Sequence, residues 1–424
     1  MANGTHPNIV KPGIAAAPIG SVLAFTFFNS LGTGAVQIGI FFLLQSAFAY
    51  GRRDNYTFGL VLYGAYVGGA LAAGPLLRRL TELLPGLSTR AVLLASLVCQ
   101  AAGSLTPQAV AWATGADAPP EWTIWIVAIG YGVFTGVMWP IVESYLSGGR
   151  KGHTLSAATG RFNVVWSGAV LVAVWLMAPL LETNPLGVIT ALGVVQLASA
   201  GLLARFGPEP GRHLPHEHEP HPGSWRHLLT VFRVLLPLAY VVSGTLAPLL
   251  PTTLESIGVR EAWRPPVASA WLVTRVIVFF LFERWPGWHG RRWMPVVAGG
   301  CLVAGFAGTV IAPWLGGSGL LVLIAMLGLF GMGHAMIYLG ALYYAMEVGR
   351  AEVDAGGTHE ALIGLGYALG PAIGLGVLLV PGGGSEAAFE SRLIAVVAVF
   401  ALAAAGIVAH RLRTLPDRPG SSSE

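Results

Sequence analysis

Charged residues are the scarcest feature of this 424-residue sequence. Asp, Glu, Lys and Arg make up 10% of it, whereas 54% of the residues are hydrophobic. An ordinary soluble domain is about 25% charged, so this composition excludes both a soluble domain and a disordered chain. Lysine is nearly absent and occurs only as Lys11 and Lys151. The arginines stand singly or in pairs between apolar runs, which excludes the concentrated basic patch of a nucleic-acid-binding protein.

Cysteine is also scarce, since Cys99 and Cys301 are the only two and both lie within apolar runs. This excludes a disulfide framework. No Walker-type loop is present, and the glycines of 364–370 lie inside an apolar run rather than after a strand, so no cofactor is expected. His359 and Glu360 are followed by Ala, Leu and Ile, which is not a zinc-protease pattern, so no enzyme is expected.

Long apolar runs fill most of the chain. The first is about 25 residues long, which suits a membrane span better than a cleavable signal peptide. Together the runs predict an all-α polytopic membrane protein with twelve transmembrane helices. The expected helices are 20–46, 56–77, 90–106, 122–147, 157–181, 186–205, 231–254, 266–283, 294–313, 319–346, 359–380 and 392–410.

The basic residues predict the orientation of these helices. If the N-terminus is cytoplasmic, 18 of the 24 Lys and Arg residues fall in cytoplasmic connections, 5 fall on the outer side, and Arg275 lies mid-span. Because cytoplasmic connections carry an excess of Lys and Arg, we expect both termini to be cytoplasmic.

One polar segment divides the chain into two halves. We expect a six-helix bundle over 1–205, a His- and Pro-rich cytoplasmic linker over 206–227, and a second six-helix bundle with a short cytoplasmic tail over 228–424. The linker contains His213, His216, His218, His221 and His227, with Glu217 and Glu219. Such side chains suit divalent metals, but a solvated low-complexity linker explains them equally, so no metal site is assigned.

The two halves contain a weak internal repeat. The helix that ends near Glu143 and the helix that ends at Glu347 are 204 residues apart, and each is followed by a short polar loop and a glycine-rich helix. Duplicated halves are typical of secondary transporters, whose substrate binds at mid-depth between them. The alternative is that glycine-rich membrane helices resemble one another by composition.

Six plus six helices, cytoplasmic termini and a central cytoplasmic linker resemble the major facilitator superfamily. Gly74, Arg78, Arg79 and Arg90 fit its signature connection between helices 2 and 3, although Leu77 or Arg78 stands near the place of the usual aspartate. The segments WPIVESYLS, GRFNVVWS, LLPTTLESIGV and GGTHEALIGLGYALGPAIG resemble an uncharacterised bacterial branch. The resemblance implies a monomer in a bacterial inner membrane that works by alternating access, with a small solute or ion and the lipid bilayer as its only partners.

Polar residues inside the spans are the candidate substrate-binding residues. Arg275 lies mid-span, where it either binds an anionic substrate, pairs with a glutamate in one state, or is held structurally by carbonyls and hydroxyls. His334, with Tyr338 one turn later, either couples proton movement to transport or simply packs. Asn29, Thr33 and Gln37 lie on one face of the first helix, which either lines a cavity or bonds to neighbouring helices.

Charged residues near the expected cytoplasmic ends of the helices form a second group. We expect them to make a cytoplasmic gate, with snorkelling surface charges as the alternative. They are Glu143, Arg161, Glu347, His359 and Glu360.

The sequence therefore predicts a secondary transporter of a small solute, anionic or polar organic, with proton coupling a further option. The alternatives are a divalent-metal or drug exporter and a non-transporting membrane sensor or scaffold.

Overall fold

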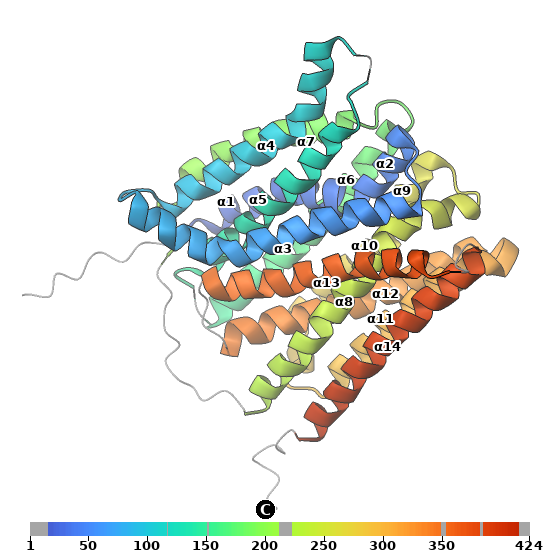
Figure 1. The fold of residues 1–424 in the computed structure, drawn as a ribbon. Coiled ribbons are helices and arrows are strands. Elements are labelled where there is room, and N and C mark those ends of the chain that lie inside the picture. Colours follow the sequence, from blue (N-terminus) through green and yellow to red (C-terminus); the bar gives the residue numbers. More distant parts are fainter. Residues whose placement is uncertain are drawn as a thin grey trace, which may run out of the picture.

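The computed structural model describes residues 16–116, 118–150, 152–211, 223–348, 353–381 and 385–414, and these ranges contain helices but no strand. Figure 1 shows the helices as one elongated bundle in which α3 and α13 run side by side. Eleven helical runs are long and apolar enough to cross a membrane. One of them, 293–345, is two helices that meet at a turn where Gly316 has φ 57°, so the described residues make twelve crossings.

The first half contains six crossings. They are α1 (Ile19–Gly32) continued by η1 (Thr33–Gly39) and α2 (Ile40–Phe48), α3 (Arg52–Leu83), α4 (Thr89–Thr114), α5 (Trp122–Ser147), α6 (Gly152–Leu181), and α7 (Gly187–Ala200) continued by η2 (Gly201–Arg205).

The second half also contains six crossings. They are α8 (Gly223–Ser256), η3 (Glu261–Trp263) with α9 (Arg264–Ala268) and α10 (Ala270–Arg284), α11 (Trp293–Ile311), α12 (Gly319–Val348), α13 (Val353–Leu379), and α14 (Glu386–Arg413), with η4 (Pro286–Trp288) and η5 (Ala312–Ser318) in the connections.

Several helices are longer than the sequence predicts. Helix α3 extends to Leu83, so Arg78 and Arg79 belong to its last turns and not to a loop. Helix α4 continues to Thr114 through Pro107, and α8 begins at Gly223 rather than at 231. The expected boundaries stop where hydropathy falls, but helices continue past the apolar core of the bilayer into the polar zone.

The same neighbour relations recur in both halves, as a duplicated architecture requires. In the first half α1 packs on α6, α3 on α5 and α4 on α5, and in the second α8 packs on α13, α10 on α12 and α11 on α12. This pattern confirms the expected fold of two pseudo-symmetric six-helix bundles.

Helix α13 joins the halves by packing on α3 and α5, and α10 joins them by packing on α6. Between α3 and α13 a Cβ added at Gly59 would lie 3.1 Å from Pro371, and one at Gly364 would lie 2.7 Å from the Tyr66 ring. Glycines on α3 and α13 therefore let the halves approach closely. At one end of the contact between α6 and α10, the Trp175 indole N–H donates to Ser269 Oγ at 3.0 Å.

Burial separates central from peripheral helices. The most apolar 18-residue stretch of α8 is 89% buried and that of the first crossing 83%, whereas that of α14 is 22% buried. Val399, Phe400, Leu402 and Ile407 of α14 are exposed apolar side chains. The multi-pass membrane protein thus places α14 against lipid and the first crossing and α8 at the centre.

The first residues of the predicted linker pack against the first half. Tyr145 Oη lies 2.9 Å from the Gly207 carbonyl oxygen, and Arg90 Nη1 donates to the Phe206 carbonyl at 2.9 Å. The Glu209 carboxylate accepts from the Thr89 N–H at 3.0 Å. Residues 206–211 are therefore bound to that half, while His213, His216, His218 and His221 lie outside the described residues.

The contact between α3 and α5 predicts one strong packing effect. A Cβ at Gly136 would lie 2.7 Å from Ala70 N and closer still to the Tyr66 carbonyl oxygen, both backbone atoms. We expect Gly136→Ala to lower the free energy of unfolding by about 1–3 kcal/mol, measured by thermal unfolding in detergent. Gly130 of the same helix has no atom within 4 Å of such a Cβ, so Gly130→Ala should leave the melting temperature unchanged or raise it slightly. Equal losses in both variants would show that close packing of α3 on α5 is not the cause.

Candidate functional site

A polar cavity lies between the two halves, with about 390 Å³ of empty space that is partly open to solvent. Both halves contribute to its wall. The lining residues are Thr33, Gln37, Tyr66, Trp139, Glu143, Phe162 and Trp166 from the first half, and Tyr240, Tyr338, Glu360, Ile363 and Tyr367 from the second. Residues far apart in the sequence therefore meet at the interface between the two halves.

The cavity wall from the first crossing has unusual backbone geometry. Residues Thr33–Gly39 form a π-helix, in which the ordinary helical hydrogen bonds are displaced by one residue. The Tyr63 hydroxyl donates to the backbone carbonyl oxygen of Gln37 at 2.6 Å. Gly34 fits closely against α6, since an added Cβ would lie 2.5 Å from the Val170 carbonyl oxygen. The π-helix therefore places Thr33 and Gln37 at the cavity while the helix stays tightly packed.

Two carboxyl groups from opposite halves meet in this cavity. Glu143 of α5 and Glu360 of α13 are both buried and both line the cavity. Tyr66 of α3 donates its hydroxyl to Glu360. Two acids from opposite halves therefore share one enclosed site, with a tyrosine hydroxyl bonded to one of them.

Arg275 of α10 lies beside the cavity among aromatic rings. Its guanidinium carbon is 4.0 Å from the centroid of the Trp166 ring and 5.3 Å from the centroids of both Phe279 and Tyr338. The side chain is 2% exposed, and Nε and Nη2 have no hydrogen-bond partner among the described residues. Cation–π attraction offsets part of the cost of this buried charge, but no carboxylate of the described chain pairs with it.

His334 is fully enclosed and does not line the cavity. Its ring centroid is 4.8 Å from that of Tyr240, 5.4 Å from that of Trp271 and 5.8 Å from that of Phe330. Neither ring nitrogen has a hydrogen-bond partner among the described residues. This environment favours the packing alternative over a proton-carrying role.

A second cavity of about 320 Å³ lies next to the first and is apolar. Its walls come from Ile38, Ser243, Leu246, Ala247, Leu250, Trp271, Leu327, Phe330 and Tyr367. Tyr367 lines both cavities. Its ring stacks on Tyr63 from the other half, with centroids 4.6 Å apart, and meets Tyr240 edge-on at 4.8 Å. Tyr367 therefore lies between the two cavities, supported by Tyr63 and Tyr240.

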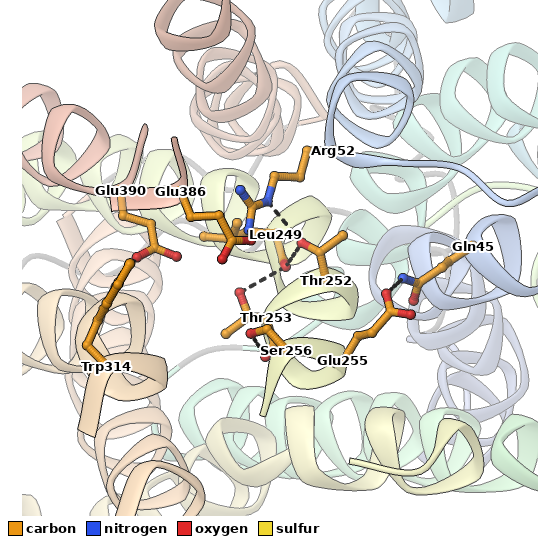
Figure 2. Close-up of polar contacts among 10 residues, drawn as sticks. All are labelled: Gln45, Arg52, Leu249, Thr252, Thr253, Glu255, Ser256, Trp314, Glu386 and Glu390. Atoms are coloured by element: carbon orange, nitrogen blue, oxygen red, sulfur yellow. Dashed lines mark hydrogen bonds and ion pairs between the residues drawn. The ribbon is translucent and has the colours of Figure 1, made fainter. Parts of the chain in front are cut away.

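Polar contacts between the halves close one end of the molecule, which we call the Arg52 end (Figure 2). Arg52 of α3 forms an ion pair of 2.6 Å with Glu386 of α14, and its Nε donates to Thr252 Oγ1 at 3.3 Å. Gln45 of α2 donates to Glu255 of α8 at 2.6 Å. Arg264 then donates to Gln45 Oε1 at 3.1 Å. These contacts tie α2 and α3 to the second half.

Nearby, Tyr50 donates to Glu121 at 2.5 Å. Burial, together with this hydrogen bond, raises the pKa of the Tyr50 hydroxyl. Tyr50 therefore remains a donor at physiological pH and holds the connection before α5 in place.

The opposite end, which we call the Arg150 end, is held by different contacts. Arg150 donates to the Leu146 carbonyl at 2.6 Å and to the Tyr145 carbonyl at 3.1 Å, so it satisfies the last carbonyls of α5. It also donates to the Ala17 carbonyl, and burial lowers the pKa of its guanidinium. This end of α5, one turn beyond Glu143, is thereby fixed within the first half.

The structure separates the residues expected to form a gate. Glu143 and Glu360 lie in the cavity, whereas Arg161 is exposed and forms no ion pair with Glu143. His359 is buried, with its ring 5.8 Å from that of Tyr338. The side chain of Glu347 lies outside the described residues. In this conformation the expected Glu143–Arg161 contact is absent, because Glu143 faces across to the other half.

Among the expected binding residues, Thr33, Gln37 and Tyr338 line the cavity. Asn29 instead donates to Ser199 Oγ of α7 at 3.2 Å, which is the interhelical alternative. The sequence pattern did not single out Tyr66, Trp139, Phe162, Trp166, Tyr240 and Tyr367. Aromatic residues are common on every span, so composition alone does not separate those that face the cavity from those that face lipid.

Comparisons with solved structures identify the fold. The chain is similar to a crystal structure of a bacterial homologue of the iron transporter ferroportin in an outward-facing state with soaked iron, with a TM-score of 0.62, 14% identity, and coverage of 93% of this chain and 98% of the other. It is similar to a mutant of the nucleoside transporter NupG, with a TM-score of 0.61, 12% identity, and coverage of 93% and 99%.

A third similar structure is a bacterial homologue of the human lysosomal transporter Spinster in an inward-facing and unoccupied conformation. Its TM-score is 0.60, with 12% identity and coverage of 95% of this chain and 98% of the other. The likeness extends to both inward-facing and outward-facing structures, so it identifies the fold and not a conformational state.

Sequence comparisons add little to this assignment. No family model matches the chain. One curated protein, the large ribosomal subunit protein uL15 of Methylocella silvestris, is 34% identical over 95 residues. That match covers 22% of this chain and spans 58% of the ribosomal protein, which is too little to show a family.

A substitution of Arg275 tests whether this side chain stabilises the fold or has a functional role instead. Since no carboxylate of the described chain pairs with its charge, and a buried charge in a membrane costs at least about 2.5–3.5 kcal/mol, Arg275→Met should leave the melting temperature unchanged or raise it. Arg284→Met serves as a control, because Arg284 is exposed and contacts only the Phe280 ring and nearby groups of its own helix. A clear loss of thermal stability in Arg275→Met alone would show that Arg275 is structural.

The contacts at the Arg52 end predict how closure responds to mutation. We expect Arg52→Gln to speed maleimide labelling of a single cysteine at Gln37, in a background without Cys99 and Cys301. An exposed ion pair contributes up to about 1 kcal/mol, which corresponds to an increase of up to about fivefold. Arg53 is exposed and forms no ion pair among the described residues, so Arg53→Gln is the matched control. Identical labelling rates in the two variants would show that these contacts do not hold the end closed.

Proposed function

We propose that this chain, which has the major facilitator fold, is a secondary transporter that moves a small organic solute by alternating access. The observation that supports this most directly is the buried cavity, whose polar wall comes from both halves. A site shared by two bundles opens to one side or the other when the bundles rock. Closure of the Arg52 end by contacts between the halves fits the same cycle.

The similar solved structures support a transporter. They are a nucleoside transporter and bacterial homologues of an iron transporter and of a lysosomal transporter, and none of the three is an enzyme. This supports the prediction that the chain is not an enzyme. A non-transporting sensor with the same fold stays the alternative, which labelling of the cavity from each side of the membrane tests.

Proton coupling is best carried by Glu143 and Glu360 rather than by His334. Both acids line one buried cavity from opposite halves, and one proton shared by the pair would relieve the repulsion between two carboxylates. When the halves separate, each carboxyl group loses its partner and meets water, so its affinity for the proton changes. Movement of the halves and loss or gain of a proton are therefore linked at this site.

Divalent-metal export is the weaker alternative. Within the described ranges, no group of three or more His, Cys, Asp or Glu side chains is arranged to hold a metal ion. The histidines that suggested metal binding are in the linker, and those from 213 to 221 lie outside the described residues. Deletion of 208–224 tests this alternative, because unchanged metal tolerance would remove it.

The distribution of arginine supports the proposed orientation. Arg78, Arg79, Arg90, Arg284 and Arg292 all lie in or beside connections at the Arg150 end. By the excess of basic residues on the cytoplasmic side, we assign this end and both termini to the cytoplasm of a bacterium and the Arg52 end to the outer face. We expect a monomer, since one chain supplies both halves of the cavity.

Alternating access predicts that the cavity is reached from each side of the membrane in turn. A single cysteine at Thr33, in a background without Cys99 and Cys301, should react with a membrane-impermeant maleimide in both right-side-out and inverted vesicles. Ser30 is one turn earlier, fully buried and not part of the cavity wall, so Ser30→Cys should react from neither side. Labelling of Thr33→Cys from one side alone would contradict alternating access and favour the sensor.

A further inference from the structure

The walls of the polar cavity carry a distinctive set of side chains. Seven of its twelve lining residues are aromatic, and its two carboxyl groups, Glu143 and Glu360, are the acids among them. Among the described residues that line it, none is Lys, Arg or His. Aromatic ring faces carry partial negative charge and attract organic cations such as quaternary ammonium groups. The lining as a whole is therefore suited to a cation and unsuited to an anion.

The positive charge of Arg275 is held apart from the cavity. Arg275 does not belong to the lining, whereas Trp166, which stacks against its guanidinium at 4.0 Å, does. An anion in the cavity would meet two carboxyl groups, and it would reach Arg275 only if the surrounding rings moved. The geometry thus argues against the anionic substrate that the sequence position of Arg275 suggested.

From these observations we propose that the cavity binds an organic monocation, with its positive group at Glu143 and Glu360 in exchange for their shared proton. This proposal rests on the proposed transporter function and names the substrate class. The balance is one proton released to solvent for each cation bound, so the net charge of the site is unchanged. That balance matters because uncompensated charge is costly in a buried site.

The apolar cavity supplies a place for the rest of the molecule. It shares Tyr367 with the polar cavity, and its described walls are Trp271, Phe330 and mostly aliphatic side chains, without a charged group. A ligand with an aromatic or aliphatic group next to its positive centre fits both compartments, with movement of Tyr367 required to join them. The two compartments thus favour an amphiphilic cation over a small hydrophilic one.

The pH dependence of binding follows from the groups that face the carboxyl pair. These are Tyr66 from α3, Tyr240 from α8, Tyr338 from α12 and Tyr367 from α13, with His359 on α13 and Arg275 on α10 close to the tyrosines. The tyrosines carry no charge near neutral pH. A cation that displaces one proton should bind up to tenfold more tightly for each unit of pH rise, as long as the pair holds that proton when empty.

The test uses two permanently charged probes of similar size, benzyltrimethylammonium and benzylsulfonate, with the purified full-length protein in detergent. Isothermal titration calorimetry in two buffers of different ionisation enthalpy gives both affinity and the number of protons released. We expect the cation to bind with release of about one proton, and the anion not to bind. Glu143→Gln and Glu360→Gln should each weaken cation binding by about tenfold or more, whereas Glu283→Gln, near the end of α10 and outside the cavity lining, should not.

The wild-type measurements stand even if a glutamate variant does not fold. Binding of benzylsulfonate that is lost in Arg275→Gln would overturn the proposal and make Arg275 the substrate-binding group. Cation binding without proton release would overturn the exchange. If neither probe binds but Thr33→Cys is labelled from both sides, the transporter stands and the cation proposal fails; if that labelling also fails, the transporter itself is contradicted.

Discussion

The cost of placing charge inside a membrane governs the centre of this molecule. Glu143, Glu360 and Arg275 are all buried at the junction of the halves, where isolated charges would be expensive. The Tyr66 hydroxyl donates to Glu360, and aromatic rings surround the guanidinium of Arg275. The aromatic walls and the close helix packing enclose all three groups.

The same constraint explains why the halves are joined as they are. Tyr66 and Glu360 lie on α3 and α13, the helices whose glycines permit the closest approach between halves. The acid from α5 reaches the same point from the first half. The contact between Tyr66 and Glu360 therefore lies within the interface between the halves, whereas Arg150 fixes α5 within its own half.

Much of the fold was predictable, because helix length and hydropathy report directly on a bilayer of fixed thickness. The twelve crossings and the two-bundle arrangement are confirmed. Helix ends were less accurate, as α3, α4 and α8 extend beyond their apolar stretches. The polar face of the first helix also divided in a way the sequence did not indicate: Thr33 and Gln37 reach the cavity, but Asn29 bonds to Ser199. Asn29 lies in the regular α-helix before the π-helix, whereas Thr33 and Gln37 lie within it. Regular helical spacing does not mark where that segment begins.

The π-helix of Thr33–Gly39 has a consequence for the whole first crossing. A π-turn accommodates one residue more than an α-turn over the same rise. Gln37 lies at the cavity within the π-helix, and Gln45, which donates to Glu255 at the Arg52 end, lies in the α-helix that continues from it. Because the surplus residue is absorbed within this segment, an ordinary α-helix one residue shorter would carry α2 in nearly the same orientation, and Gln45 would keep its contact with Glu255. The wall at Thr33 and Gln37 would change instead, so the inner wall of the cavity and the contact at the Arg52 end are set separately along one helix.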